Sequence, residues 1–187
     1  TTLTPTLVHV QCYGDSTGKI TVTAQGGTPF TTGNLYTYAI AGPTSGNTGQ
    51  IIVGAACTFK GLKAGSFVIT VTDKNGCTTT VAATLTENPK IYITDFSIKQ
   101  VRCFGESNGE VHAIATGGVP VLSYALNPTF PAFQLNGDFL GLTARTYTLV
   151  VKDALGCQID TNFRLPQPQP LRFSQVDLTP ITCKSYN

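Results

Sequence analysis

The chain contains two copies of one sequence pattern. Residues 61–77 (GLKAGSFVITVTDKNGC) return as residues 141–157 (GLTARTYTLVVKDALGC). Residues 12–29 return as residues 103–120, and both segments run from a cysteine through a Gly-Gly pair to a proline. Such self-similarity is typical of an array of like modules. We therefore expect function to lie in the array rather than in one pocket.

The spacing of the copies predicts the domain organisation. A length of 187 residues accommodates two domains of about 80 to 90 residues, which is a usual size. We predict a first domain over residues 1–88 and a second over residues 89–168. The start of a further copy is present at residues 180–183 (PITC). Residues 169–187 are therefore expected to hold a linker and the first strand of a truncated third repeat.

The composition argues against several classes of partner. Charged residues make up 12% of the chain and the formal net charge is +2, which is too small to indicate binding to nucleic acid or to an anionic membrane. No apolar run approaches the roughly 18 residues of a membrane span. We expect no nucleic-acid partner and no membrane insertion in this segment.

Alternating apolar and polar residues predict β-strands. In the first copy this period of two covers residues 19–25 and 66–72, and the second copy keeps the same phase at residues 111–115 and 147–151. Further strands are expected at residues 7–11, 36–40, 51–59 and 78–86. No helical period is present, and Gly, Asn and Asp turn signals separate the runs. The pattern predicts an all-β chain of tandem immunoglobulin-like antiparallel β-sandwiches arranged end to end, with stiff, proline-bearing junctions.

The ordered motifs resemble those of the SprB-type repeats found in very large cell-surface adhesins of Bacteroidetes. The shared segments are residues 12–18, 20–29, 36–38 and 61–77, and again residues 103–109, 111–120 and 141–157. The resemblance implies secretion through the type IX system, attachment to the outer surface, and roles in adhesion and gliding motility. It also implies that the partners are other repeats of the same long chain and a surface polysaccharide or substratum.

Two departures from the repeat pattern stand out. Arg145 replaces the turn glycine found at Gly65, and Cys57 has no equivalent in the second copy. The family has no catalytic residues to carry over. The resemblance therefore implies a non-catalytic stalk, and the alternative is a carbohydrate-binding accessory segment of a secreted multidomain enzyme.

The six cysteines favour an oxidising, extracellular setting. Five of them occupy repeat-equivalent places: Cys12, Cys103 and Cys183, and Cys77 and Cys157. Pairing within a copy, Cys12 with Cys77 and Cys103 with Cys157, is the simplest interpretation. Cys57 is expected to be unpaired.

Geometry suggests a second pairing. In an immunoglobulin-like order Cys12 lies at one end of its module and Cys77 at the other. Several strand residues separate these ends, and each residue adds about 3.3 Å. A disulfide, however, needs Cα atoms within about 7 Å. In an end-to-end stack Cys12 approaches Cys157 of the next module instead. In that arrangement, Cys103 and Cys77 are each expected to pair with a cysteine of a neighbouring copy. Both pairings stay open, as do free thiols.

Enzymatic and metal-binding interpretations find little support in the residues. His9 and His112 occupy no repeat-wide position, and no Ser/His/Asp or Cys/His set is indicated. We expect no catalytic residues and no cofactor. Calcium is a weaker alternative, for which the candidate ligands are the turn acids Asp15, Asp73, Glu106 and Asp153.

Two further candidate sites involve aromatic and hydroxyl side chains. Most aromatic residues share the phase of core positions, and the better candidates for exposed contacts are Phe30, Phe130 and Phe133, which are expected in loops. The residues 15–17 (DST) resemble the short O-glycosylation sequon of Bacteroidetes. Ser16 is therefore a candidate acceptor, with a plain turn serine as the alternative.

Overall fold

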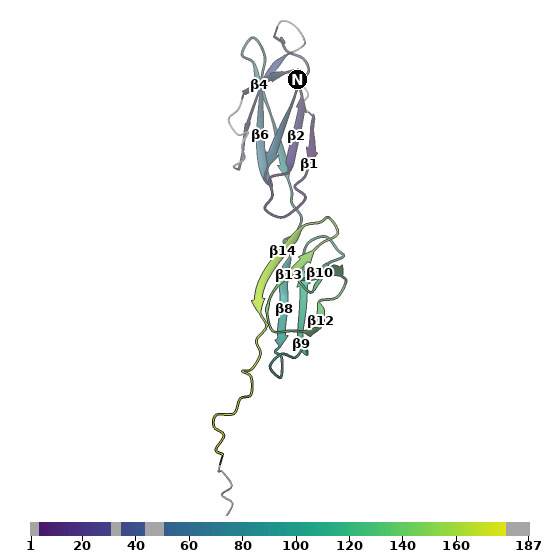
Figure 1. Ribbon diagram of the computed structural model, residues 1–187. Coiled ribbons are helices and arrows are strands. Elements are labelled where there is room, and N and C mark those ends of the chain that lie inside the picture. Colours follow the sequence, from purple (N-terminus) through teal and green to yellow (C-terminus); the bar gives the residue numbers. More distant parts are fainter. Residues whose placement is uncertain (1–3, 31–34, 44–50, 179–187) are drawn as a thin grey trace, which may run out of the picture.

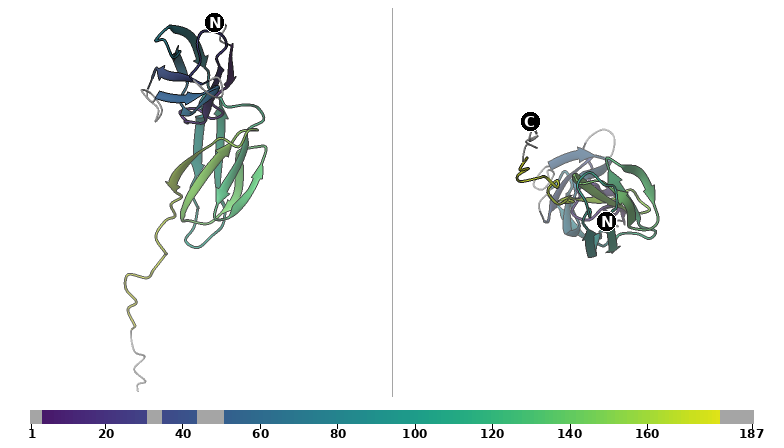
Figure 2. Two further views of the ribbon diagram at one scale, coloured as in Figure 1. Left: turned by 90° about the horizontal axis from the view of Figure 1, so that it is seen from above. Right: turned by 60° about the horizontal axis from the view of Figure 1, so that its bottom comes forward.

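The computed structural model describes residues 4–30, 35–43 and 51–178 and contains two β-sandwiches stacked end to end (Figure 1). Figure 2 shows the same stacking from other directions, with the C-terminal segment leaving the far end of the second sandwich. Within these described ranges there is no helix that is long and apolar enough to cross a membrane.

The first sandwich contains seven strands in two antiparallel sheets. One sheet has the order β1 (Thr4–Val8), β2 (Gly18–Thr23), β5 (Ala56–Leu62). The other has the order β4 (Ile51–Gly54), β3 (Tyr36–Ala41), β6 (Gly65–Thr72), β7 (Thr78–Leu85).

The second sandwich repeats this topology. Its three-stranded sheet has the order β12 (Asp138–Leu142), β9 (Gly109–Thr116), β8 (Tyr92–Lys99). Its four-stranded sheet has the order β11 (Phe130–Gln134), β10 (Ser123–Asn127), β13 (Thr146–Lys152), β14 (Gln158–Arg164). The predicted fold class, tandem immunoglobulin-like sandwiches end to end, is confirmed.

Several predicted strand limits are wrong. The single strand expected at residues 51–59 is two strands, because the chain bends at residue 55 and crosses from the sheet of β4 to the sheet of β5. Gly54 lies at this bend, where an added Cβ would lie 2.9 Å from the Ala56 carbonyl oxygen. The first strand begins at Thr4 rather than at residue 7. Residues 169–178 contain no strand, and the rest of the expected third copy lies outside the described residues.

The two cores are built from equivalent side chains. Phe67 of β6 and Tyr147 of β13 are both fully buried, as the alternating pattern predicts. A second equivalent pair ties the two sheets of each sandwich together: the backbone N–H of Ala24 donates to the hydroxyl of Tyr38, and that of Ala115 donates to the hydroxyl of Tyr124. Burying each tyrosine with a hydrogen-bonded hydroxyl avoids the cost of an unpaired polar group.

Candidate functional site at the junction between the sandwiches

A buried aspartate shapes the hairpin turn at the upper end of the second sandwich, which faces the first. Asp153 follows β13, and its Oδ1 accepts the backbone N–H groups of Leu155 and Cys157, each at 2.9 Å. Its Oδ2 accepts the N–H of Val119 at 3.0 Å, which ties the hairpin to the Gly-Gly loop after β9. This explains why Gly-Gly-x-Pro and Asp-x-x-Gly-Cys occur together in each repeat: they form one hydrogen-bonded unit that presents the cysteine.

The first sandwich contains the same unit at Asp73. Asp73 Oδ1 accepts the N–H groups of Asn75 and Cys77 at 2.9 Å, and Oδ2 accepts that of Thr28 at 3.0 Å. The hydrogen bond from Thr28, followed by those from Cys77 and Asn75, outweighs the effect of burial and lowers the pKa of the Asp73 carboxyl below its ordinary value. The unit is therefore held by an ionised carboxylate.

We expect the first sandwich to lose stability in acid through Asp73. Because the folded-state pKa is below the unfolded value of about 3.9, the contribution is fully present above pH of about 4 and is lost as the pH falls through the folded pKa. Chemical denaturation between pH 7 and pH 2 measures this loss. Asp73→Asn should flatten the profile, whereas Asn75→Ala, which keeps the backbone donors, should retain its slope. An unchanged slope in Asp73→Asn would refute the assignment.

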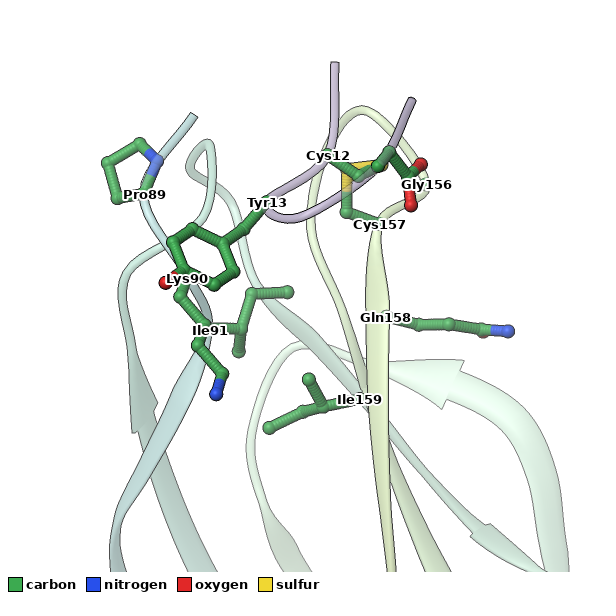
Figure 3. Close-up of a pocket in the computed structure, with 10 residues that line it drawn as sticks. Cys12, Tyr13, Pro89, Lys90, Ile91, Gly156, Cys157, Gln158 and Ile159 are labelled. Carbon is green, nitrogen blue, oxygen red and sulfur yellow. A yellow bond between two sulfur atoms is a disulfide. The ribbon is translucent and has the colours of Figure 1, made fainter. Parts of the chain in front are cut away.

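A disulfide joins the two sandwiches. Cys12, after β1, is bonded to Cys157, the residue just before β14, with a Cα–Cα distance of 5.5 Å and a sequence separation of 145 residues (Figure 3). Of the two pairings that the sequence leaves open, the structure contains this inter-module pair. Cys12 does not bond to Cys77, nor Cys103 to Cys157, because each of these pairs lies at opposite ends of one sandwich.

Polar contacts flank the disulfide on the first-sandwich side. The Gln11 Nε2 donates to the Leu155 carbonyl at 3.1 Å, and the Gln11 carbonyl accepts the side-chain amide of Asn88 at 2.8 Å. The N–H of Gly14 donates to Glu87 Oε2 at 2.6 Å, which fixes the loop after Cys12 to the inter-sandwich linker. The linker and the disulfide loop are thus tied to each other as well as to both modules.

The second-sandwich side of the junction forms a shallow groove. Lys90 Nζ lies 5.6 Å from the ring centroid of Tyr13 and 5.4 Å from that of Tyr92, so one cation contacts an aromatic ring from each module. Ile91, below Tyr13, and Ile159, on β14 below Cys157, line a groove of about 300 Å³ (Figure 3). The sequence did not predict these contacts. The second copy has other residues at the positions equivalent to Lys90, Asn88 and Gln11, so the repeat pattern does not mark them.

The other described cysteines carry free thiols. Cys57 is 2% exposed and unpaired, and burial raises the pKa of its thiol to about 11, which keeps it protonated. Cys77 and Cys103 are exposed thiols. Cys183 lies outside the described residues.

Of the three aromatic candidates for exposed contacts, Phe133 is exposed, whereas Phe30 and Phe130 are half-buried. Phe130 and Phe133 were expected in loops, but both lie in strand β11. Phe130 packs against Phe139, with ring centroids 5.6 Å apart, and the Phe133 ring is covered by Lys152 Nζ at 3.8 Å.

The remaining candidates are Ser16 and the four turn acids. Ser16 is exposed in the loop before β2, and its glycosylation remains a prediction. Asp73 and Asp153 direct their carboxylates at backbone N–H groups, while Asp15 and Glu106 lie in exposed turns. Within the part of the chain that the structure describes, no group of three or more His, Cys, Asp or Glu residues could hold a metal ion. The calcium alternative remains untested.

Comparison with known proteins identifies the repeats. Residues 4–45 and residues 96–129 match the family model described as the SprB repeat. Comparison with curated protein sequences gives no match.

Among solved structures, the chain is similar to the C-terminal 282-residue fragment of intimin, crystallised with the intimin-binding domain of the translocated intimin receptor. The two chains share 14% identity with a TM-score of 0.47. The match covers 89% of this chain and 64% of the intimin fragment. It is also similar to the three N-terminal domains of the bacteriophage RB49 highly immunogenic outer capsid protein, at 15% identity and a TM-score of 0.39, covering 87% and 58%. The fibronectin(III)-like modules of Clostridium thermocellum CbhA match at 10% identity and a TM-score of 0.34, covering 87% and 92%. The chain therefore spans about three fifths of the first two structures. The two segments that match the SprB repeat, residues 4–45 and 96–129, lie one in each sandwich.

Proposed function

We propose that the chain is a non-catalytic segment of a large cell-surface adhesin, acting as an extended stalk that carries a binding or traction point away from the cell. The SprB repeats and the immunoglobulin-like sandwiches, which are non-enzymatic domain types, support this function. Exposure on the outer surface, type IX secretion and service in gliding motility are part of the same proposal. Its partners are the neighbouring repeats of the long chain and a surface polysaccharide or substratum.

The observation that carries the proposal is the double covalent connection at the junction. Residues 86–91 link the sandwiches on one side, and the Cys12–Cys157 disulfide links them on the other. A single linker lets one module swing about it, whereas two separated attachments oppose bending in the plane that contains them. Such a joint keeps the sandwiches extended, which is what a stalk requires.

The exposed C-terminal segment supports continuation of the array. Leu171 and Phe173 are fully exposed, yet they correspond to Ile91 and Ile93, which pack into the core of the second sandwich. Large apolar residues left in water are unfavourable. We infer that the segment forms the first strand of a third sandwich when its neighbouring strands are present.

A glycan array separates the stalk from the alternative of a carbohydrate-binding accessory segment. The stalk should give no saturable signal for any glycan above that of an inert protein, with a known lectin as the positive control. A specific signal that is lost in Phe133→Ala, the most open of the three candidate rings, would favour the carbohydrate-binding alternative and contradict the proposal.

A further inference from the structure

We propose that the exposed Cys103 and Cys77 thiols are the two halves of a second inter-module disulfide. Cys103, at the lower end of the second sandwich, bonds to the hairpin cysteine of the following repeat. Cys77, at the upper end of the first sandwich, bonds to the lower-end cysteine of the preceding one. The occupant of each face is a second repeat of the same kind.

The turn around Cys103 has the conformation of the turn that is already bonded at Cys12. The N–H of Glu106 donates to the Cys103 carbonyl at 3.3 Å, as that of Asp15 donates to the Cys12 carbonyl at 3.2 Å. The N–H of Gly105 donates to Gln167 Oε1 at 2.9 Å. This bond is the counterpart of the one from Gly14 to Glu87 at the first junction.

A third equivalence lies just before each cysteine. The N–H of Arg102 donates to Asn108 Oδ1 at 3.0 Å, and the N–H of Gln11 donates to Thr17 Oγ1 at 3.4 Å. The Arg102 side chain is a hydrogen-bond donor, as the Gln11 amide is at the existing junction. The face of the second sandwich is therefore preformed to receive a hairpin.

The turn around Cys77 has the conformation of the turn that is already bonded at Cys157. Asp73 accepts the N–H of Cys77 at 2.9 Å, and Asp153 accepts the N–H of Cys157 at the same distance. The N–H of Asp73 donates to the Cys77 carbonyl at 3.0 Å, and that of Asp153 to the Cys157 carbonyl at 2.9 Å. A cysteine held in this unit already forms a disulfide in this chain.

The bond forms by thiol–disulfide exchange with a small disulfide such as oxidised glutathione. The Cys103 thiolate attacks the small disulfide and releases one thiol, and the hairpin thiolate then attacks the mixed disulfide and releases the second. The two protein thiols lose two protons and two electrons, and one molecule of oxidised glutathione is reduced to two of the thiol.

Closing both kinds of junction gives the array a continuous covalent path that runs through only one strand of each sandwich. From Cys77 the chain runs through β7, the linker and β8 to Cys103, so that 26 residues (77 to 103) cross two sandwiches. Tension that enters at Cys77 and leaves at Cys103 therefore passes outside residues 13–76. The inference rests on the proposed function only in taking further repeats to adjoin this chain.

The test uses a tandem chain of residues 1–171 followed by residues 1–187. Thr1 of the second copy then takes the place of Arg172, which keeps the spacing of 80 residues between Cys103 and the next lower-end cysteine (103 to 183). After oxidation in a glutathione buffer, peptide mapping without reduction should find Cys103 of the first copy bonded to Cys77 of the second. The alkylated fraction of that Cys103 should be at least about tenfold below the alkylated fraction of the first copy's Cys77. The first copy's Cys77 is the reference because no repeat precedes it in the tandem chain.

Two results would overturn the proposal. One is full alkylation of the first copy's Cys103 and the second copy's Cys77 in a tandem chain whose Cys12–Cys157 bonds have formed. The other is a Cys103 bond to a different cysteine. In the matched control, Cys103→Ser in the first copy should leave the second copy's Cys77 open to alkylation. Because this map does not depend on the glycan array, failure of the disulfide and failure of the stalk function are distinguishable.

Discussion

Pulled by its two ends, the oxidised chain should reach a final length about 500 Å shorter than the reduced chain. The disulfide spans 145 residues, and an extended chain covers about 3.6 Å per residue. With the bond intact, tension runs from the N-terminus to Cys12, across to Cys157 and on to the C-terminus. Residues 13–156 then form a closed loop that bears no load, even if both sandwiches unfold.

Single-molecule force spectroscopy measures this difference directly. Adding a reductant to the chain, or the substitution Cys12→Ser, should release the full additional length, whereas the matched substitution Cys57→Ser should not. Equal final lengths with and without reductant would show that the junction bears tension through the sandwiches. In that case the disulfide would not act as a mechanical bypass.

Phe67→Ala should destabilise the first sandwich by about 3 to 5 kcal/mol, the usual cost of removing a fully buried aromatic side chain. The Phe67 side chain is 1% exposed. It packs so closely on Gly42 that an added Cβ there would clash with the ring. The ring therefore fills its site completely, and its loss leaves a cavity.

Denaturant titration checks the size of this effect. The control is Val68→Ala in the same strand, where the side chain is 47% exposed and the cost should stay within about 0.5 kcal/mol. A loss below about 1 kcal/mol for Phe67→Ala would mean that the core can collapse into the vacated space.

The alternating strands were predictable because each sandwich buries one face of each sheet. A period of two places Ile20, Val22, Phe67 and Ile69 on the inner face regardless of the rest of the fold, and all four are buried. The run at residues 51–59 was not predictable in the same way. The strands β4 and β5 belong to different sheets, and only Gly54 marks the place where the chain crosses between them.

The junction was only partly predictable. The repeat marks Cys12 and Cys157 as equivalent to other cysteines, but a pairing between modules depends on how the two sandwiches stack. The stacking depends on contacts such as those of Lys90 and Asn88, which the second copy replaces with Pro170 and Pro168. A comparison of the copies therefore identifies the cysteines but not the residues that orient them.

Peptide mapping of the oxidised, unmodified chain without reduction shows directly whether Cys12 and Cys157 join the two sandwiches. We expect a cross-linked peptide that contains Cys12 and Cys157, together with alkylated thiols at Cys77 and Cys103 and protection of Cys57 until the chain unfolds. A peptide that joins Cys12 to Cys77 would contradict the inter-module disulfide, because the two sandwiches would then lack their second covalent connection.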